Sequence, residues 1–154
     1  MCSSDLRAAI EDFKATGARL RLPYYLSLLA DTYGDAGRPA EGLIVIEEAC
    51  AQSRASNERW WDAELHRLRG ELMFAAGRDL RDVETALARA RDIARGQQAR
   101  SLELRTALSA CLVGAAESPR AEDRRALADI YAWFSEGFDT PDLRAARALL
   151  IQWS

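Results

Sequence analysis

The feature of this sequence that most constrains its fold is an internal repetition of helical segments. Three short segments that end in an arginine precede equivalent helical patterns, at offsets of 40 and 41 residues: Gly17-Ala18-Arg19, Asn57-Glu58-Arg59 and Gln98-Ala99-Arg100. The patterns end at the same offsets of 40 and 41 residues, at Gly37, Gly77 and Ser118. Because the starts and the ends repeat in step, the sequence predicts a repeated structural unit.

The central copy, Asn57 to Gly77, is predicted to form one long amphipathic helix. Its apolar residues recur every three or four positions, which is the period of a helix: Trp61, Leu65, Leu68, Leu72 and Ala76. Asn57 is a residue type that caps helix starts, and Gly77 tolerates the left-handed conformation of a helix end. Adjacent residues of a helix face different directions, so we expect Trp61 to be buried and Trp60 to be exposed.

The rest of the chain also follows a helical period. The predicted helices cover Ser4–Thr16, Leu22–Ala36, Pro39–Ser53, 79–94, Ser101–Gly114, 118–134 and a last segment that starts at Thr140. Asp79 and Thr140 are the expected caps of two of these helices. No segment alternates with a period of two, and the connections are short, which makes successive helices antiparallel neighbours. The predicted fold class is all-α.

Charge and composition exclude several kinds of partner. The formal net charge is -3, from 21 basic and 24 acidic residues that are interspersed, whereas a nucleic-acid surface needs concentrated positive charge. No apolar run approaches the ~18 residues of a membrane helix, and no export signal opens the chain. Cys2, Cys50 and Cys111 lack metal-ligand spacing and suit a reducing compartment. We therefore expect a cytoplasmic protein that binds neither nucleic acid nor a membrane.

No residue pattern predicts an active site, a cofactor site or a metal site. His66 is the one histidine, and a single histidine on a helix flank is more typical of a structural role than of catalysis. Acidic residues such as Glu47, Glu48 and Glu71 show no sign of the burial that shifts a carboxylate pKa. The glycines lack the spacing and the following lysine of a phosphate-binding loop. We expect a non-catalytic protein.

Within the copies, large and small residues alternate as in a known repeat family. The first unit, Leu26-x-x-Leu29-Ala30-x-x-Tyr33 followed by Gly42-x-x-x-Ile46-x-x-Ala49, resembles a tetratricopeptide repeat. The second keeps Gly70 and Val83-x-x-x-Leu87-x-x-Ala90 but has His66, Arg69 and Met73 where the family favours apolar or aromatic residues. The third is weaker, with Ala107, Ala110-Cys111 and Gly114. The resemblance implies a right-handed α-α superhelix of about 3.5 helical hairpins with a C-terminal capping helix.

Longer stretches resemble a narrower group of proteins. Segments 22–43, 58–72, 99–109 and 131–150 are similar to the C-terminal helical repeat region of bacterial multidomain regulators with an ATPase domain, of the adenylate cyclase-like or LuxR/MalT-like layout. This implies that residues 1–154 are a single repeat domain, either a C-terminal fragment or a short paralogue of a larger signalling or transcriptional regulator. The first helix resembles the second half of a repeat, and its apolar side suggests the hypothesis of a homodimer through this end.

Superhelices of this kind bind partners on the concave face, which the first helix of each hairpin lines. Across the copies, Tyr24, Glu64 and Arg105 are equivalent, as are Ser27 with Arg67 and Asp31 with Glu71. Together with Trp60 these residues form the predicted partner-binding groove: Tyr24, Ser27, Asp31, Trp60, Glu64, Arg67, Glu71 and Arg105.

The predicted function is a protein-interaction scaffold whose partner is a protein or peptide with an apolar anchor and charged flanks. The alternative is a sensor module that binds a small effector in the groove. Such a module would relay a conformational change to a cyclase, ATPase or DNA-binding domain elsewhere in the regulator.

Overall fold

The computed structural model describes residues 3–114 and 120–153, and within these ranges the chain is helical with no strand. The helices are α1 (Ser3–Ala15), α2 (Leu22–Asp35), α3 (Pro39–Ser56), α4 (Asp62–Ala75), α5 (Leu80–Gly96), α6 (Arg100–Gly114), α7 (Ala121–Trp133) and α8 (Pro141–Gln152). A short 3-10 helix, η1 (Arg59–Trp61), precedes α4. The predicted all-α class is confirmed.

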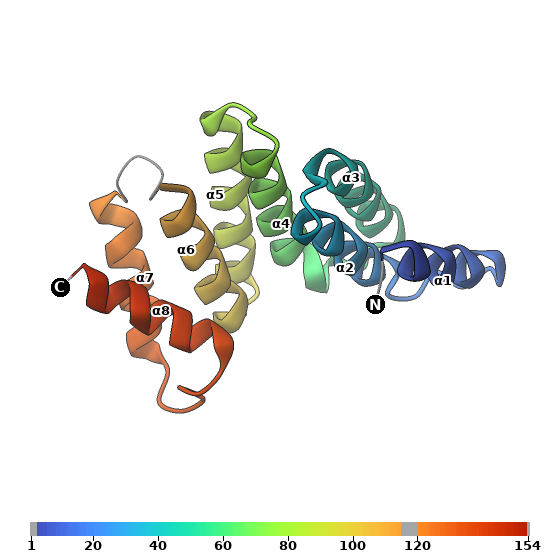
Figure 1. Cartoon of the computed structure of the whole chain (residues 1–154). Coiled ribbons are helices and arrows are strands. Elements are labelled where there is room, and N and C mark those ends of the chain that lie inside the picture. Colours follow the sequence, from blue (N-terminus) through green and yellow to red (C-terminus); the bar gives the residue numbers. More distant parts are fainter. Residues whose placement is uncertain (1–2, 115–119, 154) are drawn as a thin grey trace.

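The helices form a row in which each one packs against the next in sequence (Figure 1). Alternate helices also contact each other, because α4 packs against both α2 and α6, and α6 packs against α8. In Figure 1 the row runs from α1 at one end to α7 and α8 at the other. The even-numbered helices α2, α4, α6 and α8 therefore lie next to one another and share one side of the row.

The largest departure from the predicted helices is at Asn57. Asn57 does not start a helix; it adopts a left-handed conformation, with φ 58°, and ends α3. Asparagine tolerates this conformation better than most residues, so the same side chain type that caps helix starts also suits a helix end. The chain then turns through η1, and α4 begins at Asp62, whose carboxylate accepts a hydrogen bond from Ser53 on α3.

The other predicted helix boundaries agree with the structure to within a few residues, and the caps give a mixed result. Asp79 caps α5 as predicted, since its carboxylate accepts a hydrogen bond of 2.8 Å from the amide of Arg81. Thr140 precedes α8 as predicted, but its hydroxyl donates to the carbonyl of Gly137 instead of capping the helix. The predicted helix start at Ser118 lies outside the described residues, and α7 ends before Phe134.

The apolar core consists of two large clusters joined by smaller ones. The first cluster lies between α1, α2, α3 and α4 and includes the fully buried Ala30, Ile46 and Ala49. The second lies between α6, α7 and α8 around Leu127. Smaller clusters around Ala94 and around Val83 connect them through α4, α5 and α6. A core spread along the row, with each part made by neighbouring helices, is what a repeat architecture requires.

The apolar stripe of α1, which suggests the homodimer hypothesis, packs against α2 and α3 in the first core cluster. Ile10 is 4% exposed, and Leu6 and Phe13 are half-buried against the first cluster. The homodimer stays a prediction, but this stripe is mostly packed against the protein's own core.

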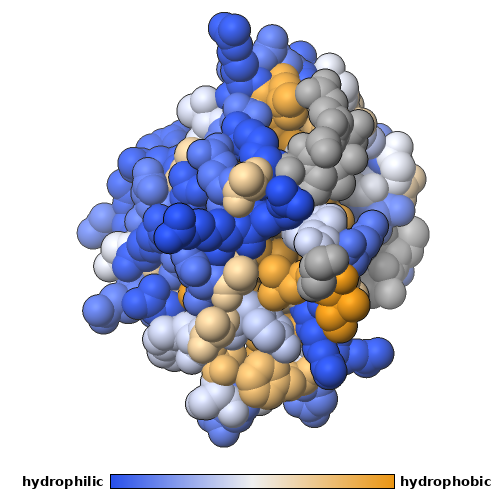
Figure 2. All heavy atoms as spheres, turned by 90° about the vertical axis from the view of Figure 1, so that its left-hand side faces the viewer, coloured by the Kyte–Doolittle hydropathy of each residue, from blue (hydrophilic) through white to orange (hydrophobic). Residues whose placement is uncertain are grey.

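The larger exposed apolar side chains of the opposite end are Leu112, Trp133, Phe138 and Ile151, and apolar residues are visible on that end in Figure 2. Among the described residues, no helix has the length and apolar character needed to cross a membrane.

Gly42 allows α3 to approach both α2 and α4. A Cβ atom at this position would lie 2.7 Å from Cδ2 of Leu72 on α4 and 3.0 Å from the carbonyl oxygen of Ala30 on α2. Gly70 on α4 is similarly close to α5, because its Cβ would lie 2.9 Å from Cδ2 of Leu87. These are the positions that the repeat pattern assigns to small residues at helix contacts.

We expect Gly42→Ala to lower the free energy of unfolding by about 1–3 kcal/mol, because the new methyl group would force the two neighbouring helices apart. The matched control is Gly96→Ala near the end of α5, where an added Cβ meets no atom within 4 Å. This control should be neutral or stabilising by up to ~1 kcal/mol, since alanine favours the helix. Urea unfolding of both variants checks the prediction, and equal effects of the two substitutions would contradict it.

Candidate functional site

The predicted groove residues lie on the adjacent helices that share one side of the row. Tyr24, Ser27 and Asp31 are on α2, and Trp60 is on η1. Glu64, Arg67 and Glu71 are on α4, and Arg105 is on α6. Because α4 contacts both α2 and α6, the structure places these residues, which are far apart in the sequence, on neighbouring helices. We call this set of side chains, on α2, η1, α4 and α6, the inner face.

Arg67 is the centre of a polar network on the inner face. Its Nε and Nη2 donate to the two carboxylate oxygens of Glu64, at 2.9 and 2.8 Å, and its Nη1 lies 2.6 Å from Oε1 of Glu71. Nη1 also donates to Oγ of Ser109 on α6, at 3.1 Å. Burial lowers the pKa of Arg67, but the hydrogen bond and charge of Glu64, together with Glu71, outweigh this and raise it. The guanidinium is a permanent cation that ties α4 to α6.

Arg105 extends the network along the row. Its Nη1 lies 2.8 Å from Oε1 of Glu64, so Glu64 is held by two arginines from two helices. Its Nε lies 3.8 Å from Oδ2 of Asp142 on α8. Ser109 and Asp142 were not predicted as site residues. Ser109 and Arg105 are both on α6 one turn apart, which is the signal that would have found Ser109, whereas Asp142 lies beyond the three repeated copies.

The burial of three predicted residues corrects the predicted groove. Ser27, Glu64 and Arg67 are 1%, 2% and 5% exposed, so they are not available to a partner from solvent. The physical reason is that α2, α4 and α6 pack closely, and a buried charge must be paired within the protein. These three residues hold the helices together, and the rest of the predicted set forms the accessible part of the inner face.

Aromatic side chains occupy one end of the inner face. The ring of Tyr24 lies 5.9 Å from that of Trp60 and 5.3 Å from that of Trp61, measured between ring centroids. Trp61 is half-buried, and its Nε1 donates a hydrogen bond of 3.0 Å to Oγ of Ser27. Trp60 is 48% exposed. As predicted, one tryptophan is packed against the core and its neighbour presents a large aromatic surface to solvent.

Charged groups follow this aromatic surface along the inner face. Asp31 is exposed, and the side chains of Glu71 and Arg105 are 37% and 31% exposed. Asp142 on the adjoining helix α8, beside Arg105, is 47% exposed. Partial loss of water raises the pKa of Asp31, and the negative charges of Asp35, Glu71 and Glu64 add to this shift while Arg67 opposes it. The accessible part of the inner face therefore carries more negative than positive charge.

Cys50, Cys111 and His66 are buried or half-buried among the packed helices. Cys50 and Cys111 are buried free thiols, and burial raises the pKa of each to about 11, so they are protonated near neutral pH. His66 is half-buried on α4, and burial together with the charge of Arg69 lowers its pKa. In the part of the chain that the structure describes, no group of three or more His, Cys, Asp or Glu side chains is placed to hold a metal ion.

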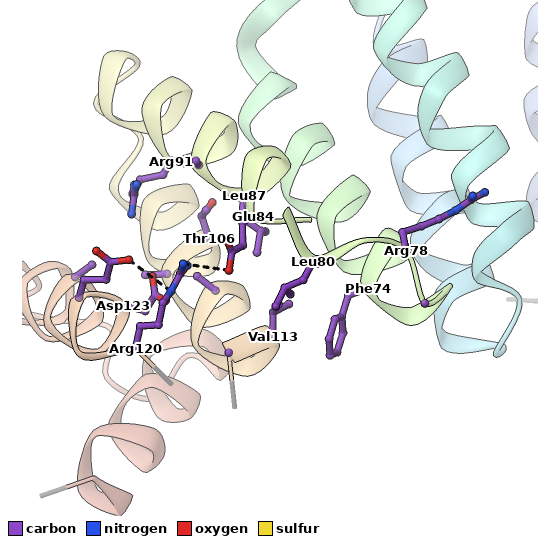
Figure 3. A pocket seen from close by; sticks show the side chains of 17 residues that line it. Phe74, Arg78, Leu80, Glu84, Leu87, Arg91, Thr106, Val113, Arg120 and Asp123 are labelled. Carbon is purple, nitrogen blue, oxygen red and sulfur yellow. Dashed lines mark hydrogen bonds and ion pairs between the residues drawn. The ribbon is translucent and has the colours of Figure 1, made fainter. Parts of the chain in front are cut away.

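A cleft elsewhere in the protein shares no lining residue with the inner face. This cleft of about 340 Å³ is bordered by α5, α6 and α7 and by the turn after α4 (Figure 3). Five residues with little or no side chain leave this space open: Ala88, Ala107, Ala110, Gly114 and Ala126. Arg120 connects two borders of the cleft, because it pairs with Glu84 on α5 at 3.1 Å and with Asp123 on α7 at 2.9 Å.

Comparison with known proteins adds one relative. No protein-family model matches the chain, and no solved structure matches it significantly. The chain is 36% identical over 89 residues to an uncharacterised protein of Rhizobium meliloti (strain 1021). The similarity covers 58% of this chain and 9% of that protein, so the matched segment is a small part of a much longer relative.

Proposed function

We propose that the chain is a non-catalytic scaffold that binds a protein or peptide segment along the inner face. Its architecture would be a right-handed superhelix of about 3.5 tetratricopeptide-like hairpins, with α8 as the cap. Contacts between alternate helices support this proposal, as do the close approaches at Gly42 and Gly70. The observation that carries it is the position of the exposed Trp60 and the half-buried Tyr24 next to accessible charged groups on adjacent helices.

The chemistry of the inner face indicates the kind of partner. A large aromatic surface next to charged groups matches the composition of binding hot spots, where tryptophan, tyrosine and arginine dominate the energy. Asp31, Glu71 and Asp142 outnumber Arg105 among the accessible charges. The proposed partner is therefore a segment with an apolar or aromatic anchor for Trp60, followed by lysine or arginine residues.

The biological setting that we propose is a cytoplasmic signalling or transcriptional regulator. The resemblance of segments 22–43 and 131–150 to the repeat regions of such regulators supports this setting. The match to a small part of a much longer relative is consistent with a helical segment that serves inside a larger protein. In that setting the scaffold would couple an output domain to another protein.

We expect Trp60→Ala to weaken peptide binding about thirtyfold, because truncating a central aromatic anchor costs about 2 kcal/mol. Peptides that bind the chain are first selected from a displayed random library and then measured by calorimetry against wild type and variant. The control is Ile44→Ala on α3, which removes another exposed apolar side chain, 72% exposed, away from the inner face. Selected peptides should contain an apolar residue near basic ones. Peptides that bind W60A as tightly as wild type would overturn the proposal.

A further inference from the structure

Arg91, on the border of the cleft between α5, α6 and α7, has a buried donor without a hydrogen-bond partner. Among the described residues, Nε of Arg91 is one of two buried side-chain nitrogen or oxygen atoms that form no hydrogen bond, the other being Nδ1 of His66. Arg91 is on α5 and lines the cleft. A buried N–H without an acceptor costs free energy, and the cost is larger on a charged group. A carboxylate placed in the cleft beside the guanidinium would supply the counter-charge that Arg91 lacks.

The acidic residues of the cleft do not supply this acceptor. Glu84 and Asp123 form ion pairs with Arg120. The side chain of Glu122 is 74% exposed, and its Oε1 lies 3.5 Å from Nε of Arg120. Within the ranges that the structure describes, Arg91 forms no ion pair with a carboxylate. Its charge is therefore available to a ligand, while the neighbouring carboxylates are already satisfied or screened by water.

The remainder of the cleft is suited to a hydrocarbon group. Leu87 and Val113 are 4% and 6% exposed and pack with the half-buried Leu80 in one apolar cluster. In the view of Figure 3, Arg91, Thr106 and Asp123 lie on one side, and Leu80, Val113 and Phe74 lie on the other. Arg78 points away from both groups. The cleft thus has a polar part at Arg91 and an apolar part at Leu80.

We propose that this cleft binds a small apolar carboxylate. The carboxylate accepts hydrogen bonds from the Arg91 guanidinium, whose planar fork matches a carboxylate, and the hydrocarbon lies against Leu80, Leu87 and Val113. The volume of about 340 Å³ is at the lower end of the range for small-molecule sites, so the ligand is small. This site is separate from the inner face and does not depend on the scaffold function.

Octanoate, octan-1-ol and octylamine test the proposal, because they share one hydrocarbon chain and differ in the head group. Each is titrated into the isotopically labelled full chain, and binding is followed by backbone amide NMR shifts. Octanoate should shift the amides of cleft-lining residues saturably and bind about tenfold or more tightly than octan-1-ol, since a hydrogen bond to a charged group adds to affinity. Octylamine should bind most weakly. Equal affinities for octanoate and octan-1-ol, or no saturable shifts at the cleft, would overturn the proposal.

Arg91→Met tests whether the preference for octanoate over octan-1-ol comes from the Arg91 side chain. This variant should bind octanoate no more tightly than octan-1-ol, whereas Arg89→Met, which removes an exposed arginine from the same helix, should keep the wild-type preference. If R91M fails to fold, Ala88→Leu replaces it as the test. The larger side chain fills the cleft and should weaken the binding of octanoate and octan-1-ol alike. An R91M variant with wild-type affinity for octanoate, or an A88L variant with unchanged affinity for both, would contradict the assignment.

Discussion

Replacing Arg67 with alanine is expected to lower the free energy of unfolding by about 3–5 kcal/mol. The substitution removes one of the two arginine partners of Glu64, which is 2% exposed, and breaks the hydrogen bond to Ser109 that ties α4 to α6. Glu64 keeps its contact with Arg105 but loses two hydrogen bonds in a place that water does not reach. Chemical unfolding at neutral pH measures the effect.

Arg69→Ala provides the control for this prediction. Arg69 is on the same helix and pairs with Glu47 on α3, but its side chain is 36% exposed and that of Glu47 is 50% exposed. A surface ion pair of this kind contributes about 0–1 kcal/mol. If R67A and R69A lose similar amounts of stability, the buried network does not hold α4 against α6, and our explanation of the inner face is wrong.

The second large effect is expected at Leu127, which is fully buried in the cluster between α6, α7 and α8. Leu127→Ala should cost about 2–5 kcal/mol through lost burial and the cavity that remains. Because the apolar clusters follow one another along the row, the loss should be local. Hydrogen exchange should therefore become faster at amides of α7 and α8 and stay unchanged at amides of α2 and α3.

Leu112→Ala is the matched control for Leu127→Ala. Leu112 is on α6 in the same half of the chain but is 55% exposed, so its truncation should change stability by no more than about 0.5 kcal/mol. Exchange that becomes faster throughout the chain in L127A would show that the protein unfolds as a single cooperative unit. That outcome would contradict a repeat architecture with nearest-neighbour contacts.

The sequence predicted the helices well because the information is local. The apolar spacing of three and four residues, together with Gly37 and Gly77 at helix ends, defined most elements. The prediction at Asn57 was wrong because asparagine suits both a helix start and the left-handed end of a helix. The side-chain hydrogen bonds of Ser53 to the Glu58 carbonyl and to Asp62 accompany the turn, and the sequence pattern does not reveal them. The apolar spacing that includes Trp61 predicts one continuous helix, so it does not distinguish the short 3-10 helix η1 from the start of α4.

The candidate site was predicted in part, since the repetition identifies which residues share a face but not how deeply they are buried. Equivalence of Glu64 with Arg105 placed both on adjacent helices, and the structure joins them at 2.8 Å. Whether such a pair faces solvent depends on how closely α4 and α6 pack and on the side chains around the pair, which the equivalence of positions in a repeat does not specify. The cleft was missed for the same reason, because it arises from alanine and glycine residues on three different helices.

The most direct test of the scaffold proposal is site-specific photo-crosslinking in cells that express the protein. A photoreactive amino acid is placed at position 24, 60 or 105 on the inner face, or at position 44 or 112 on other exposed surfaces. We predict that the three inner-face positions capture the same protein, through a peptide with an apolar anchor near basic residues, and that positions 44 and 112 do not. Capture of that protein only from position 44 or 112, with none from the inner face, would contradict the account.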